Sequence, residues 1–130
     1  MTETREKDIR HSRRLDALSK ITTYMREHYR EELKLSDVAA TFGYSDAYLS
    51  RMFQKYAKIN YKTYLQDIRM AYAYRDLLNT DHTISQIALD NGFCSSRGFF
   101  RGNFRKRYGV LPSEMRKQIN EKRSKKNAID

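Results

Sequence analysis

One short pattern occurs twice in this sequence, 49 residues apart, and it restricts the possible folds more than any other feature. In the first copy Ala39 is followed four residues later by Gly43, and in the second copy Ala88 and Gly92 keep the same spacing. Where two helices cross steeply, a small residue is needed at the crossing, and the tight turn between them needs a residue that tolerates positive φ. Each copy therefore predicts a helix-turn-helix motif, and recurrence in register makes the prediction more specific.

The apolar positions around these small residues repeat as well. The first copy has Leu35, Val38 and Tyr44 where the second has Ile84, Ile87 and Phe93. Between the copies, apolar residues at helical spacing over about 61–79 predict a long linker helix. One proline and five glycines in 130 residues suit long helices, and no strand pattern is present. We predict an all-α fold of about seven helices, with two tandem helix-turn-helix subdomains joined by the linker helix.

The expected boundaries follow from where the helical period starts and stops. Apolar spacing begins at Leu15 and predicts a first helix that extends to about Arg30. Ser36 and Ser45 are candidate N-caps of the next two helices, and Pro112 suits the start of the final helix. In chain order we expect a polar tail or interdomain linker at 1–14, the helical domain at 15–117 and a charged tail at 118–130. Within the helical domain the first helix-turn-helix lies at about 35–57, the linker helix at about 61–79 and the second helix-turn-helix at about 83–108.

The charge balance points to a polyanionic partner. Lysine and arginine number 26 against 16 aspartate and glutamate, a net charge of +10. A surplus of this size favours nucleic acid first and an anionic membrane surface second.

Other classes of protein are disfavoured by what the sequence lacks. No apolar run approaches the ~18 residues that span a bilayer, and residues 1–14 contain no apolar core of a signal peptide. The single Cys94 excludes a disulfide framework and a multi-cysteine zinc site. His11, His28 and His82 show no catalytic or metal-binding spacing with each other or with Cys94. We therefore expect a cytoplasmic protein that is not an enzyme, uses no cofactor or metal and has no membrane partner.

The exposed face of the first recognition helix follows from an advance of about 100° per residue. Leu49, Phe53 and Tyr56 cluster on one side as the expected anchors. The opposite side holds the candidate base-reading residues Ala47, Ser50, Arg51 and Gln54. Arg51 is the strongest candidate, because the guanidinium fork matches the acceptors of guanine.

Three stretches carry a resemblance to a known family. Residues 35–53 read LSDVAATFGYSDAYLSRMF, residues 84–93 read ISQIALDNGF, and residues 104–116 read FRKRYGVLPSEMR. They resemble the AraC/XylS family of bacterial transcription regulators, whose most diagnostic stretch is the closing aromatic-Gly-x-x-Pro-Ser-x-x-Arg. The resemblance covers about residues 17–116.

That resemblance implies a function beyond what spacing shows. It implies a sequence-specific regulator of double-stranded DNA, monomeric engagement of two adjacent major grooves, and activation of promoters by contact with RNA polymerase. Most members carry an effector-binding domain ahead of this module, so a missing N-terminal effector or dimerisation domain is also expected. The alternative from another class is a basic helical module that binds RNA or an acidic protein.

The second copy departs from the family spacing. Between the glycine and the core phenylalanine the family usually has one more residue in the second copy than in the first, whereas this chain has two more, so one residue is extra. If the extra residue sits in the turn, Phe100 and Phe104 are the anchors. If it forms a π-bulge in the helix, Phe99 becomes an anchor. Arg101 stays near DNA in either register. The candidate base-reading residues here are Arg97, Gly98, Arg101 and Gly102.

Further residues are candidates for binding DNA phosphates, either as cations or at helix N-termini. They are Ser36, Ser45, Lys55, Lys62, Ser95, Ser96, Arg105 and Lys106.

Gly98 and Gly102 each cost about 1 kcal/mol of helix propensity relative to alanine. We therefore expect the second recognition helix to be looser than the first in free protein, and to act mainly through phosphates and DNA deformation. Amide hydrogen exchange measures this: residues 95–108 should exchange faster than residues 45–56. Equal protection of the two segments would contradict the expectation.

Overall fold

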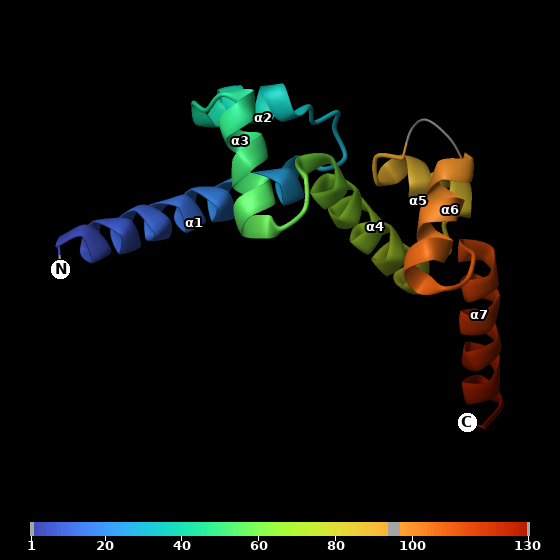
Figure 1. The fold of residues 1–130 in the computed structure, drawn as a ribbon. Coiled ribbons are helices and arrows are strands. Elements are labelled where there is room, and N and C mark those ends of the chain that lie inside the picture. The colour runs from blue at the N-terminus through green and yellow to red at the C-terminus, as the bar shows by residue number, and fades with distance from the viewer. Residues whose placement is uncertain (1, 94–96, 130) are drawn as a thin grey trace. The chain divides into compact units, whose positions relative to one another are not determined.

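A computed structural model describes residues 2–93 and 97–129. Every regular element in these ranges is helical, which confirms the all-α fold and its seven α-helices. The chain forms two compact units, Met1–Ile68 and Arg69–Asp130. In chain order the elements are α1 (Thr2–His28), α2 (Leu35–Phe42), α3 (Asp46–Met52), the π-helix η1 (Phe53–Ala57), α4 (Tyr61–Asn79), α5 (Ile84–Asp90), α6 (Arg97–Tyr108) and α7 (Pro112–Ile129) (Figure 1).

The core of the first unit is closed by aromatic and aliphatic side chains from all its helices. Phe53 is fully buried and meets the ring of Tyr61 edge to face at 5.5 Å. The hydroxyl of Tyr61 donates to the carbonyl of Leu33 at 2.9 Å, so the start of α4 is tied to the loop before α2. The remaining fully buried large side chains of this core are Ile21, Met25, Val38 and Leu49.

The turn between the two helices is the same in both units. Gly43 adopts φ 77° and donates its N–H to Ala40 at 3.2 Å, while Tyr44 donates to the carbonyl of Ala39 at 2.8 Å. This is a Schellman motif, which satisfies the last carbonyls of a helix and needs a left-handed residue. In the second unit Gly92 adopts φ 89°. There Phe93 donates to Ala88 at 2.9 Å and Gly92 donates to Leu89 at 3.2 Å. The sequence-based prediction of both turns is confirmed.

The second core gathers around the phenylalanines of α6. Phe100 and Phe104 lie 5.9 Å apart, centroid to centroid. They pack with buried residues of α4 and α5 and with Phe93, which follows α5: Met70, Ala73, Leu77, Ile87, Ala88 and Phe93. A polar contact is enclosed in the same unit, because the fully buried amide of Asn91 donates to a carboxylate oxygen of Asp76 at 2.8 Å. It also donates to the carbonyl of Ile87, at 2.8 Å.

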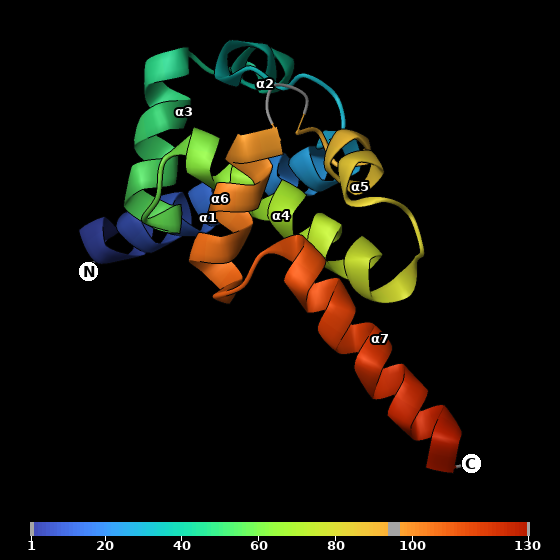
Figure 2. The ribbon, with the colours of Figure 1, turned by 90° about the vertical axis from the view of Figure 1, so that its right-hand side faces the viewer.

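Helix α7 caps the end of α4. The last carbonyls of a helix lack partners within it. The Arg116 guanidinium donates to the carbonyls of Thr80, at 3.0 Å, and of His82. Arg123 donates to the carbonyl of Leu78 at 2.6 Å. Beyond these contacts the end of α7 projects away from α5 and α6 (Figure 2). The arginine that closes the diagnostic stretch thus ties α7 to the segment between α4 and α5.

Two of the expected helix starts are confirmed, and the N-cap expected at Ser36 is wrong. Ser45 accepts from the N–H of Tyr48 at 3.1 Å and caps α3, and α7 begins at Pro112. Ser36, however, does not cap α2. The carbonyl of Lys34 already accepts from the N–H of Val38 at 3.2 Å, so the helix begins before Ser36, which is exposed in its first turn.

The two outer helices are longer than the sequence pattern indicated. Helix α1 begins at Thr2, where a start at Leu15 was expected, and α7 continues to Ile129 through the segment expected to be a charged tail. Leu15 itself is 43% exposed. Residues 4–13 are all exposed, so they have no apolar period to detect. They contain neither proline nor glycine, and glutamate, lysine and arginine have high helix propensity.

Two glycine-to-alanine changes should shift stability in opposite directions. Nothing lies within 4 Å of a Cβ added at Gly43 or at Gly102, so neither change clashes. At Gly43 the positive φ makes alanine cost about 1–2 kcal/mol of the free energy of unfolding, whereas in α6 Gly102→Ala should gain about 1 kcal/mol. Urea unfolding followed by far-UV circular dichroism measures both. Shifts of the same sign would show that backbone conformation is not the cause.

Candidate nucleic-acid interface

Helix α3 is anchored on one side and exposed on the other. Leu49 and Met52 are buried beneath it. Of the residues expected to read bases, Ala47, Arg51 and Gln54 are exposed, and Ser50 is half-buried. The anchored side fixes the helix, and the other side leaves an arginine and small polar or apolar groups accessible to a partner.

The recognition helix continues from α3 into the π-helix η1 without a break and ends at Lys58, which has φ 65°. The wider turn changes the rotation per residue, so an advance of 100° no longer places the side chains beyond Phe53. Tyr56, expected as an inward anchor, is only half-buried. Single π turns are frequent at functional sites. The sequence had suggested a π-bulge as one alternative for the second copy, whereas the structure has its π-helix in the first.

Helix α6 resolves the two registers considered for the second copy. It is an unbroken α-helix in which Phe100 and Phe104 are buried, whereas Phe99 is 42% exposed. Phe100 and Phe104 are therefore the anchors, and the alternative with Phe99 as an anchor is wrong. The exposed side carries Gly98, Arg101, Gly102, Arg105 and Lys106.

The remaining candidate residues differ in whether the structure describes them. Ser95 and Ser96 lie outside the described residues, as does Cys94, and nothing is described of the side chain of Arg97. The candidate phosphate-binding residues Lys55 and Lys62 are exposed.

Phe99 is an exposed side chain that sequence reasoning did not assign to the interface. It stands beside Gly98, and its ring centroid lies 6.4 Å from that of Phe93. A sequence signal existed: residues 99, 100 and 104 are all phenylalanine, and only the pair four residues apart shares one face of a helix.

A second feature missed from the sequence is a cluster where α1 meets η1. The guanidinium of Arg14 donates a long hydrogen bond of 3.5 Å to the hydroxyl of Tyr56, and the His11 ring lies 5.4 Å from the Tyr56 ring. The ammonium of Lys55 lies 5.4 Å from the same ring. The hydrogen bond from Arg14, with the charge of Lys55, lowers the pKa of Tyr56, and the same bond raises the pKa of Arg14.

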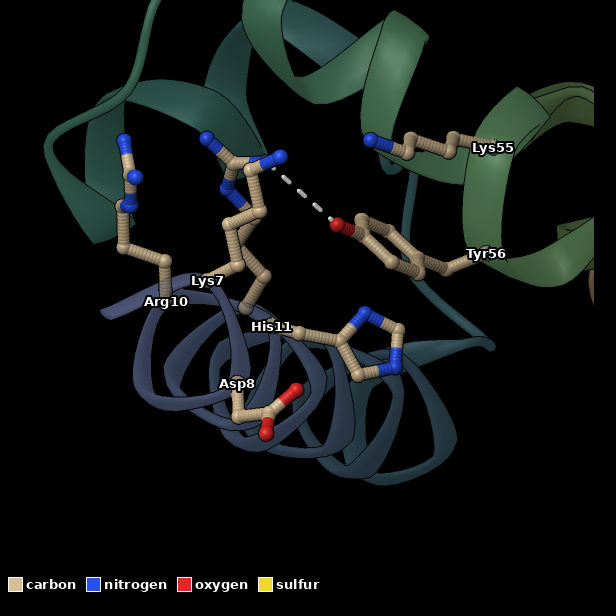
Figure 3. Close-up of a pocket in the computed structure, with 7 residues that line it drawn as sticks. Lys7, Asp8, Arg10, His11, Lys55 and Tyr56 are labelled. Atoms are coloured by element: carbon tan, nitrogen blue, oxygen red, sulfur yellow. Dashed lines mark hydrogen bonds between the residues drawn. The ribbon is translucent and has the colours of Figure 1, made fainter. Parts of the chain in front are cut away.

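Two cavities flank this cluster. One, of about 410 Å³, is lined by Lys7, Asp8, Arg10, His11, Arg14, Lys55 and Tyr56 (Figure 3). The other, of about 330 Å³, is lined by Arg14, Tyr48, Arg51, Met52, Lys55 and Tyr56. Arg51, on the exposed face of α3, and Arg14, on α1, therefore line the same cavity.

The described part of the chain lacks the features of two other kinds of site. None of its helices is long and apolar enough to cross a membrane. Within the same ranges no group of three or more histidine, cysteine, aspartate or glutamate residues could hold a metal ion.

Known proteins share both the sequence pattern and the fold. A family described as a helix-turn-helix domain matches residues 38–118. The HTH-type transcriptional regulator ExsA of Pseudomonas aeruginosa is 33% identical over 127 residues, 98% of this chain and 43% of ExsA. The chain thus spans less than half the length of the curated relatives it matches.

Two solved structures match over most of their length. A transcriptional regulator of Chromobacterium violaceum, described by its AraC-type DNA-binding domain, has a TM-score of 0.75 and 30% identity over 81% of this chain and 93% of that one. The DNA-binding domain of AdpA, solved with a target DNA, has a TM-score of 0.75 and 25% identity over 82% of this chain and 96% of that one.

Proposed function

Because this chain belongs to the AraC-type family of helix-turn-helix DNA-binding domains, we propose that it is a sequence-specific transcription regulator that reads double-stranded DNA with α3 and α6. The family and the relatives above are transcription regulators and not enzymes. The observation that carries the proposal is the duplicated turn. In both units a left-handed glycine joins two helices, and the second is held by buried residues while its other side is exposed.

In the first unit, Arg51 is the main reader of bases. A guanidinium can donate two hydrogen bonds to the O6 and N7 acceptors of a guanine in the major groove. Ser50 adds a hydroxyl, and Gln54 can pair with adenine. Ala47 is small, so it allows close approach and contact with a thymine methyl group. The exposure of Arg51 and Gln54 supports these roles.

In the second unit, the recognition helix reads fewer bases. Gly98 and Gly102 offer no side chain, and they let the backbone approach DNA closely. Arg101 is the base-reading candidate, together with Arg97 four residues before it in the sequence. Arg105 and Lys106 supply phosphate contacts at the far end of α6, so this unit contributes mainly to affinity and to the shape of the bound DNA.

The two helices are proposed to enter adjacent major grooves of one DNA face. Helix α4 has 19 residues, which at ~1.5 Å each span ~28 Å, and successive major grooves are ~34 Å apart. We further propose that the bound chain activates transcription by contacting RNA polymerase in the cytoplasm, as the family resemblance implies.

Selection from random or genomic duplexes with the purified chain tests the proposal. We expect one consensus with two half-sites about one helical turn apart. RNA or an acidic protein is the rival partner, and competition decides between them. If RNA displaces the selected duplex at equal or lower concentration, the DNA proposal is wrong.

Arg51→Ala should relax base preference at one position of the consensus by roughly 1–3 kcal/mol, because the bidentate contact is lost. Arg26→Ala is the matched control, since Arg26 is an exposed arginine of the same unit on α1. Binding to single-base variants of the selected duplex measures the effect. An unchanged preference in Arg51→Ala would mean that Arg51 touches only the backbone.

Binding should also weaken steeply with salt. The chain has a net charge of +10. When cations such as the exposed Lys55, Lys62 and Lys106 neutralise phosphates, the counterions bound to the DNA are released. For six to ten phosphate contacts, affinity should fall by about 10³–10⁵ between 50 and 200 mM salt. A titration of the selected duplex at several salt concentrations measures the slope, and flat affinity over this range would contradict the proposed contacts.

A further inference from the structure

The first turns of α1 add charge to the first unit without adding to its core. Residues 4–13 are all exposed, and the buried residues of α1 begin at Leu18. These first turns extend a helix whose later turns include buried residues, and adding turns to an existing helix needs no new nucleus. This exposed part of α1 lies beside η1. The described contacts are those of Tyr56 with the guanidinium of Arg14 and the ring of His11.

The charges of this segment are ordered. Lys7, Arg10 and Arg14 follow the spacing of three and four residues that puts side chains on one face of a helix. We call these three residues the α1 basic face. Lys7 and Arg10 point to the side on which Lys55 projects from η1, while the carboxylate of Asp8 points away (Figure 3).

The cavity between α1 and η1 therefore has an excess of positive charge. Four cations, the α1 basic face and Lys55, line it with one carboxylate, that of Asp8. Within the described residues, neither Lys7, Arg10 nor Lys55 forms an ion pair with a carboxylate, and Arg14 is bound to a neutral hydroxyl. Cations held together without acidic partners favour an anionic ligand.

The position of the cavity indicates which anion. Arg14, Lys55 and Tyr56 line both this cavity and the one that Arg51 lines. A duplex whose bases meet Arg51 carries a phosphate charge about every 1.7 Å along its axis, so backbone phosphates lie next to any major-groove contact.

We infer that the α1 basic face, with Lys55, binds the phosphodiester backbone beside the groove read by Arg51. This inference rests on the proposed function. It extends the footprint of the first unit beyond its helix-turn-helix, and it adds affinity without base preference because a phosphate carries no sequence information.

The test compares two double variants of equal charge change. Lys7→Gln with Arg10→Gln removes two cations of the α1 basic face and leaves Arg14 with Tyr56. Arg5→Gln with Arg13→Gln removes two exposed cations of the same helix that do not line the cavity. Far-UV circular dichroism checks that both keep the helix, and affinity is measured on the duplex selected by the wild-type chain.

The first variant should bind that duplex roughly tenfold more weakly, with a slope of log affinity against log salt shallower by about 1–2 and an unchanged consensus. The second should stay close to wild type. Equal losses in the two variants would overturn the inference while leaving the proposed function intact. A wild-type chain that selects no consensus would overturn the proposed function and this inference with it.

Neutral methylphosphonates, placed one at a time in the selected duplex, locate the contact. The wild-type chain should lose affinity at one or two positions where the Lys7→Gln, Arg10→Gln variant loses none. Inorganic phosphate at constant ionic strength tests the other source of the same chemistry. Saturable binding of phosphate to the α1 basic face, with no position-specific methylphosphonate effect, would identify a free-anion site and overturn the inference.

Discussion

The structure depends on one backbone constraint, the reversal of the chain at a left-handed glycine directly after a short helix. At Gly43 and again at Gly92 the turn brings the chain back to an alanine that lies four residues before the glycine. The hydrogen bond from the next residue, Tyr44 or Phe93, reaches the carbonyl of that alanine, which is itself buried. A single local geometry thus fixes how the second helix leaves the first, and a larger residue at the alanine would push the two apart.

From that constraint the two units develop differently. In the first, the recognition helix widens into a π turn at Phe53 and ends at Lys58, and Tyr56 of that turn contacts Arg14 and His11 of α1. In the second, a regular α-helix keeps Phe100 and Phe104 in one line and leaves Phe99 exposed. After the same turn, the exposed face of the recognition helix therefore carries polar and charged side chains in the first unit, whereas in the second unit it includes two glycines.

What could be predicted from the sequence follows from what the chain must bury. The turns, the anchors Leu49 and Phe104 and the exposure of Arg51 were predictable, because small residues and apolar spacing encode them. The first half of α1 was not, since a helix with nothing to bury leaves no apolar period. Nor was the π turn, because the sequence has its extra residues in the second copy, whereas the π turn lies in the first.

The buried amide of Asn91 shows how far the two halves of this duplication have diverged. At the matching position the first half has Phe42, and Asp76 is matched by the exposed Glu27. Moving the α5 segment into the first half would carry along the carbonyl acceptor of Ile87, but the second acceptor would have to be Glu27, whose side chain is exposed and one methylene longer than that of Asp76. The enclosed amide–carboxylate pair is thus a feature of the second unit that the matching positions of the first unit do not repeat.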